Sequence, residues 1–134
     1  MVYEKKITDE GKNEILKLAF LNENSNPFCY CALGREGSTA SSTGDWRNFN
    51  EFTGSNYHRE QITSTGPQNN RLEASCIFND DNYYDTEQGL TVTEIALCNS
   101  YEEESPLCFA FSQVPEIKKT GNVSLKYTWI INIE

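Results

Sequence analysis

The chain has 134 residues and a net charge of -9, from 11 Lys and Arg against 20 Asp and Glu. Such an acidic surface repels phosphate groups, so the composition argues against nucleic acid and anionic membranes as partners. No apolar run approaches the roughly 20 residues that cross a bilayer, so membrane insertion is not expected. The length predicts a single domain over residues 1–134.

The chain has five cysteines and a single histidine, the residue types that most often bind metals. No Cys-x-x-Cys pair is present, so neither a metal site nor a cofactor is predicted. The first residues contain no apolar signal-peptide core, so we expect synthesis in a cytosol and reduced thiols. In a strand, Cys29 and Cys31 would share one face, as two small core residues do.

A helix is predicted from about Asp9 to Leu21, with Thr8 or Asp9 as its cap. Polar residues spaced by three and four form a solvent-facing stripe along this helix, and apolar residues occupy the remainder of its surface. Gly11 costs a helix about 1 kcal/mol relative to alanine, which suggests that another segment packs closely against it. Pro27 excludes continuation of the helix.

A strand over Phe28–Gly34 is followed by a polar loop of about residues 35–56. An unstructured loop of that length in a compact domain is usually functional or mobile. Its aromatic residues either pin the loop to its own domain or contact a partner. The candidate interface residues are Trp46, Phe49, Phe52 and, from the last strand, Ile130.

Alternating apolar residues predict the remaining strands at residues 57–63, 71–78, 90–100, 107–114 and 123–133. Turns are expected at 64–70 and a connection at 115–122. In the last strand Ile130 breaks the polar outer face, which suggests cover by the helix, a loop or another subunit. The predicted fold class is mainly β with one N-terminal helix (α+β), an antiparallel β-sandwich-like domain. The residues expected to face its core from the last strand are Val123, Leu125, Tyr127, Trp129, Ile131 and Ile133.

The sequence contains no recognisable catalytic set. His58 has no nucleophile signature around it, and no glycine loop matches a phosphate-binding loop. The acidic stretch at 79–88 lacks the ligand spacing of a calcium loop. We therefore predict that the protein is not an enzyme and has no catalytic residues.

Four segments resemble, in the same order, the N-terminal attachment domain of phage tail-collar fibre and baseplate-associated proteins. They are "ITDEGKNEILKLAF", "PFCYCALGREG", "GLTVTEIALCNS" and "LCFAFSQVPEIKKTGNVSLKYTWIINI". The resemblance implies a non-enzymatic virion structural protein, made in the host bacterial cytoplasm and located in the tail. Its expected partners are other tail or baseplate proteins and further copies of itself, in a threefold or ring-like oligomer.

A different function remains open from the residues alone. Aromatic side chains in polar surroundings stack on sugar rings, so the chain is alternatively a carbohydrate-binding module used in host-surface recognition. The aromatic residues considered for this role are Trp46, Phe49, Tyr57, Tyr83 and Tyr84.

Overall fold

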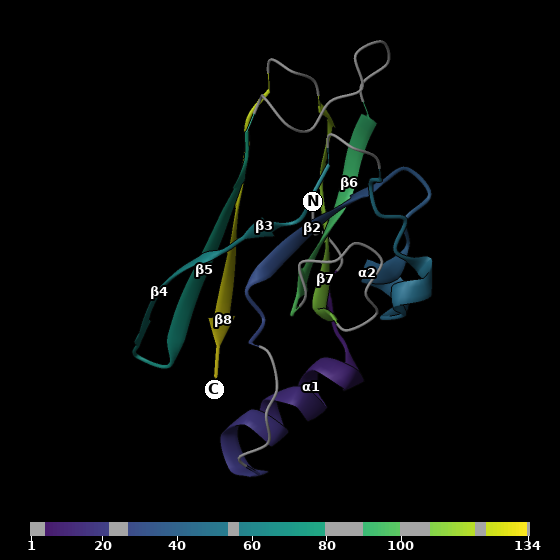
Figure 1. Ribbon diagram of the computed structural model, residues 1–134. Helices are drawn as coiled ribbons and strands as arrows, with labels where there is room; N and C mark the ends of the chain where they lie inside the picture. The colour runs from purple at the N-terminus through teal and green to yellow at the C-terminus, as the bar shows by residue number, and fades with distance from the viewer. Residues whose placement is uncertain are drawn as a thin grey trace.

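The computed structural model describes residues 5–21, 27–53, 57–79, 90–99, 108–119 and 123–133. Within these ranges two antiparallel sheets face each other and a helix lies at one end (Figure 1). The predicted mainly β, sandwich-like α+β fold is therefore confirmed. The elements are β1 (Lys5–Ile7), α1 (Asp9–Leu16), the π-helical turn η1 (Lys17–Leu21), β2 (Tyr30–Arg35), α2 (Ala40–Thr43), the 3-10 turn η2 (Trp46–Asn48), β3 (Glu60–Gln61), β4 (Thr63–Gln68), β5 (Arg71–Phe78), β6 (Leu90–Cys98), β7 (Cys108–Lys119) and β8 (Leu125–Asn132).

The larger sheet has the strand order β1-β7-β6-β2-β3 and the smaller one β4-β5-β8. Alternate residues of each strand point into the space between the sheets and form the main core. Ala74, Cys76 and Phe78, alternate residues of β5, are buried on one face of that strand. The buried members of this core are Cys31, Leu33, Phe52, Tyr57, Cys76, Phe78, Val92, Ile95, Val114 and Leu125.

The last strand, β8, pairs with β5 along its whole length. Its predicted inner face is confirmed from Val123 to Ile131, since these alternate residues are buried or half-buried. Ile133 differs, because it lies beyond the end of β8 and is 75% exposed. On the opposite face Ile130 is 52% exposed. We expected the helix, a loop or another subunit to cover it, and no described helix or loop does so.

Three predicted elements have other bounds in the structure. Of the strand predicted at 57–63, only Glu60–Gln61 form β3, and Thr63 begins β4. Strand β7 continues through Pro115 to Lys119, where a connection was expected. Proline is tolerated there because the register with β6 shifts between Gln113 and Ile117, which removes the ladder bond that proline would break. The turn expected at 64–70 is confined to Asn69–Asn70, and β4 occupies the residues before it. Both asparagines have positive φ, 54° and 61°, as two-residue hairpin turns require.

The outer face of the larger sheet is covered by residues 36–53, so the predicted loop is structured. Ala32 and Ala96 are paired on this face, and Gly34 lies beside them on β2. Such small residues allow the covering backbone to approach closely. A Cβ at Gly34 would lie 2.7 Å from the ring of Phe49. Phe49 in turn packs on Phe111, with ring centroids 5.3 Å apart.

The carboxylate of Glu94, on β6, fixes the covering segment to the sheet. Glu94 is 2% exposed, and it accepts hydrogen bonds from Ala40 N at 3.1 Å and Ser41 N at 2.8 Å. The hydroxyls of Ser38, at 2.6 Å, and of Ser41 also donate to it. Helix α2 thus begins on a buried negative charge, which satisfies backbone N–H groups that a helix start leaves open.

A bulge near the start of β7 positions the N-terminal helix. Leu97 pairs with Ala110 and Cys98 pairs with Cys108, so Phe109 is an extra residue in β7. Bulges bend a strand and free its backbone groups for other partners. Here the carbonyl of Phe109 accepts a hydrogen bond of 2.8 Å from the backbone N–H of Thr8.

Helix α1 begins at this bulge. The predicted cap is confirmed as Thr8, whose Oγ1 accepts from Gly11 N at 2.9 Å. The close packing expected at Gly11 is also confirmed, because a Cβ there would lie 2.6 Å from the Cα of Phe109. The predicted helical span, Asp9 to Leu21, is confirmed as α1 followed by η1.

We expect Gly11→Ala to destabilise the protein by about 2 kcal/mol, although alanine is the better helix former, because the added methyl group overlaps the backbone of β7. Urea unfolding followed by circular dichroism measures this difference. The matched control is Asn13→Ala, at an exposed position of the same helix, which we expect to leave stability unchanged or slightly higher. Equal stability of both variants would contradict the close contact at Gly11.

Candidate functional site

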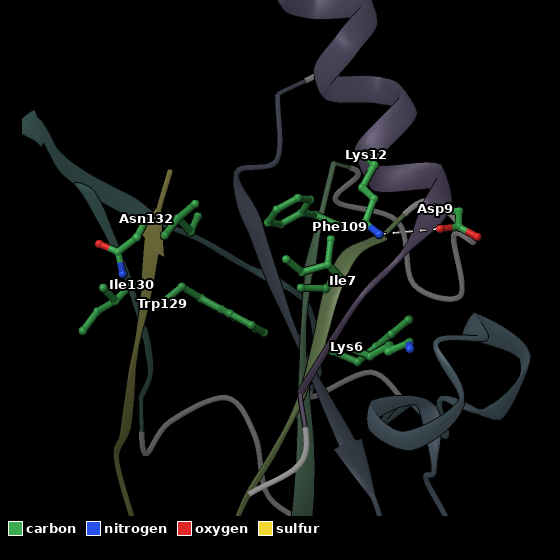
Figure 2. A pocket seen from close by; sticks show the side chains of 11 residues that line it. Lys6, Ile7, Asp9, Lys12, Phe109, Trp129, Ile130 and Asn132 are labelled. Atoms are coloured by element: carbon green, nitrogen blue, oxygen red, sulfur yellow. Dashed lines mark ion pairs between the residues drawn. The ribbon is translucent and has the colours of Figure 1, made fainter. Parts of the chain in front are cut away.

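The sandwich is open on the side where β1 and β8, the edge strands of the two sheets, lie across from each other (Figure 2). The opening is a groove of about 660 Å³. In Figure 2, Trp129 points from β8 into this groove, toward Phe109 and Ile7, whereas Ile130 points away. The groove residues are Lys6, Ile7, Asp9, Lys12, Phe109, Ala110, Phe111, Trp129, Ile130, Ile131 and Asn132.

The two strands that border the groove each have a backbone edge without a strand partner among the described residues. Strand β1 pairs only with β7, and β8 pairs only with β5. Such edges are places where a further strand is added. Strand β1 has only three residues, two of them lysines, whereas β8 has eight residues and is the longer edge.

Next to the groove, the second half of the N-terminal helix carries a set of exposed apolar side chains. Figure 1 shows this helix extending past the end of the sheets. Gly11 is the buried residue of α1, and η1 has none, so the contact of the helix with the sheets is made near its start. We call the exposed set the apolar stripe; its members and exposed fractions are Ile15 41%, Leu16 52%, Leu18 41%, Phe20 77% and Leu21 62%.

The four candidate interface residues are not brought together. Phe52 is 2% exposed and belongs to the core, where its ring lies 5.9 Å from that of Tyr57. Phe49 is half-buried against Phe111. Trp46, on η2, and Ile130, on β8, are exposed on different parts of the molecule. Phe49 and Phe52 therefore attach the loop to its own domain, the first of the two alternatives for the loop aromatics.

Sequence reasoning did not select the apolar stripe as a site. Its signal was present, since six of the seven residues from Ile15 to Leu21 are apolar. After Lys17 the polar stripe of the helix does not continue, unlike the polar face of an ordinary surface helix. The sequence predicted only that these apolar residues cover the rest of the helix, and the structure leaves them exposed.

The aromatic residues considered for sugar binding are also dispersed. Tyr57 is buried, and Tyr83 and Tyr84 lie outside the described residues. Trp46 remains 39% exposed and lines a small polar pocket of about 230 Å³ between the start of α1 and η2. The charged residues in this pocket are Lys6, Asp9, Glu10, Asp45 and Arg47.

A buried ion pair lies beside β2. Its charged groups are of the kinds that act in catalysis, but a substrate could not reach them. Arg59 donates to both carboxylate oxygens of Glu51, at 2.8 and 2.9 Å, and the two side chains are 1% and 2% exposed. The hydroxyl of Tyr57 donates to Glu51 at 2.6 Å and accepts from the backbone N–H of Leu33 at 3.1 Å. Burial, followed by the Glu51 charge, raises the pKa of Tyr57 well above its usual range. Through these bonds the cluster fixes the end of the covering segment to β2, so we interpret it as structural.

The remaining titratable groups give no further site in the described parts of the chain. His58 pairs with Glu60 at 3.1 Å. No three His, Cys, Asp or Glu side chains gather there as a metal site. The described helices also include none that is both long and apolar enough to span a bilayer.

Comparison of the chain with protein-family models, with characterised proteins and with solved structures gave no match.

We expect Glu51→Ala to destabilise the protein by about 3–5 kcal/mol, because it leaves the guanidinium of Arg59 buried without its counter-charge. The double variant Glu51→Leu/Arg59→Met removes both charges, and it should lose much less than the sum of the two single variants. Guanidinium unfolding of all four proteins measures the coupling. Additive losses would mean that the two groups do not depend on each other.

Proposed function

We propose that this protein is a non-enzymatic virion structural protein, a small tail or baseplate adaptor that docks on neighbouring virion subunits. The observation that carries the docking role is the apolar stripe, which is exposed on a helix attached to the body through its first turn. The resemblance of four ordered segments to phage attachment domains supplies the phage context. Under this proposal the protein is made in the host bacterial cytoplasm and resides in the virion tail.

The low intrinsic stability of so short a helix favours a partner that packs against it. Together α1 and η1 comprise 13 residues, from 8 and 5, a length that is marginal for a helix without tertiary packing. Burial of apolar surface stabilises an assembly by about 25 cal/mol per Å². A subunit that covered Leu16, Phe20 and Leu21 would therefore stabilise the helix and the contact together.

The groove extends this surface toward the body of the domain. Asp9 and Lys12 of α1 form part of its rim, so the helix start and the groove are continuous. A neighbour that binds the apolar stripe therefore also reaches Trp129 and the open edge of β8. Continuity of this kind suits a subunit in a closed ring or a threefold assembly, in which each copy meets two neighbours.

We expect the protein to have a mass above that of its 15.3 kDa monomer, and the variant Leu16→Ser/Phe20→Ser to shift toward the monomer while its sheets stay folded. Size-exclusion chromatography with light scattering over a range of concentrations measures the mass. The control is Ile77→Ser, which changes an exposed apolar residue on β5 (48%), similar in exposure to Leu16 (52%). A wild-type protein that stays monomeric and is absent from purified virions would exclude the adaptor role.

Carbohydrate binding is a second candidate, favoured by one observation. Trp46 is exposed beside charged groups in the pocket between α1 and η2. An aromatic face next to carboxylates and a guanidinium offers both stacking and hydrogen bonds to a sugar ring. Asp45 and Arg47 are already ordered there, since Arg47 Nε donates to Asp45 at 3.2 Å.

For this second candidate, we expect binding on a glycan array that is lost in Trp46→Ala and kept in Phe20→Ser. The loss would follow from removal of the exposed indole face, while the changed residue of the control lies on η1, outside the pocket. Array signals that are equal in wild type and Trp46→Ala, or absent in both, would count against a sugar site at this pocket.

A further inference from the structure

Strands β6 and β7 place two cysteines directly opposite each other. Cys98 and Cys108 are register partners, and their Sγ atoms lie 2.7 Å apart. Both side chains face the covering segment, in a cluster with Ala96 and Phe111. They are 0% and 2% exposed.

The pairing of these two residues across neighbouring strands is compatible with a disulfide. Directly opposed residues of antiparallel strands have Cα atoms about 4.5–5.5 Å apart. Disulfides span Cα distances of about 4.4–6.8 Å and have an S–S bond of about 2.05 Å. We infer that Cys98 and Cys108 are an oxidation site of this protein, at which an intramolecular disulfide closes the hairpin between β6 and β7.

A second pair of thiols provides a comparison within the same chain. Cys31, on β2, and Cys76, on β5, interact across the core between the two sheets. These two cysteines lie in different sheets, so they are not register partners in one ladder. Cys29 is half-buried just before β2. The pair singled out by direct register and by an Sγ separation of 2.7 Å is Cys98 and Cys108.

The surroundings of the pair determine when the bond forms. Burial is the largest influence on the pKa of Cys98 and raises it well above its usual range, and the hydrogen bond with Cys108 raises it further. The nearby guanidinium of Arg59 acts in the opposite direction. The thiolate is the reactive form, so oxidation of the folded protein is slow. In a reducing cytosol the two thiols stay free, as they are in this structure, and the bond forms when the chain folds under oxidising conditions.

The oxidant is a low-molecular-weight disulfide, such as oxidised glutathione. One protein thiolate attacks a sulfur of this disulfide and releases one glutathione thiolate, which leaves a mixed disulfide on the protein. The second protein thiolate then attacks the protein sulfur of the mixed disulfide, forms the bond between Cys98 and Cys108, and releases the second glutathione. The protein loses two electrons and two protons, and one oxidised glutathione becomes two reduced ones.

The bond lies where the N-terminal helix is attached. The carbonyl of Cys108 accepts a hydrogen bond from Thr8 Oγ1, and the next residue, Phe109, accepts from Thr8 N. A disulfide at Cys108 therefore restrains the bulge on which α1 begins. This inference stands on the geometry of the two strands and does not depend on the proposed function.

The test refolds the full chain from guanidinium in a buffer of reduced and oxidised glutathione. Free thiols are then alkylated with iodoacetamide in denaturant, and the digest is mapped by mass spectrometry. We expect one disulfide, between Cys98 and Cys108, and three alkylated cysteines, since 5 - 2 = 3. We also expect the melting temperature of the oxidised protein to exceed that of the reduced protein by about 5–10 °C, because the closed loop restrains the unfolded chain.

The controls separate this pair from the other thiols. Cys98→Ala/Cys108→Ala should show no redox-dependent melting temperature, whereas Cys29→Ala should keep the full difference. If the double variant fails to fold, the map of the wild-type protein decides. A bond between Cys31 and Cys76, mixed glutathione disulfides that do not close, or five alkylated thiols in the oxidising buffer would each overturn the inference.

Discussion

A carboxylate buried against a β-sheet must be hydrogen-bonded, and Glu94 meets this requirement with donors from residues 38–41 alone. This constraint determines the outer layer of the domain. The start of α2 at Ala40 aims two backbone N–H groups at the carboxylate, and this contact holds residues 36–53 across the larger sheet. The small residues beneath make that approach possible, and the ion pair of Glu51 and Arg59 closes the far end.

A second constraint comes from one extra residue in β7. The bulge lies at Phe109, whose carbonyl accepts the hydrogen bond from Thr8 N that extends the pairing of β1 with β7 toward α1. It also brings Cys108 opposite Cys98, because the pairing shifts by one position. The same backbone irregularity therefore attaches the helix, requires glycine at position 11 and aligns two thiols.

Features that depend on local pattern could be predicted from the sequence. The alternation in β5 and β8, the cap at Thr8 and the close contact at Gly11 each follow from the neighbouring residues. The path of β7 through Pro115 could not be predicted, because a register shift with β6 makes proline acceptable. The covering layer was missed for a similar reason, since nothing near Glu94 in sequence shows that its partners lie more than 50 positions away.

These differences move the candidate site from the loop to the helix. The loop aromatics looked available because loops are usually solvated, but Phe52 and Tyr57 complete the core between the sheets, and Phe49 covers the outer sheet face. The many apolar residues of the helix are typical of a helix that packs on a core, but Gly11 is the buried residue of α1. Residues 36–53 thus cover the domain's own sheet, and the apolar stripe stays exposed. An exposed set of this kind, beside an open strand edge, is the feature of the fold that the chain's own packing does not explain.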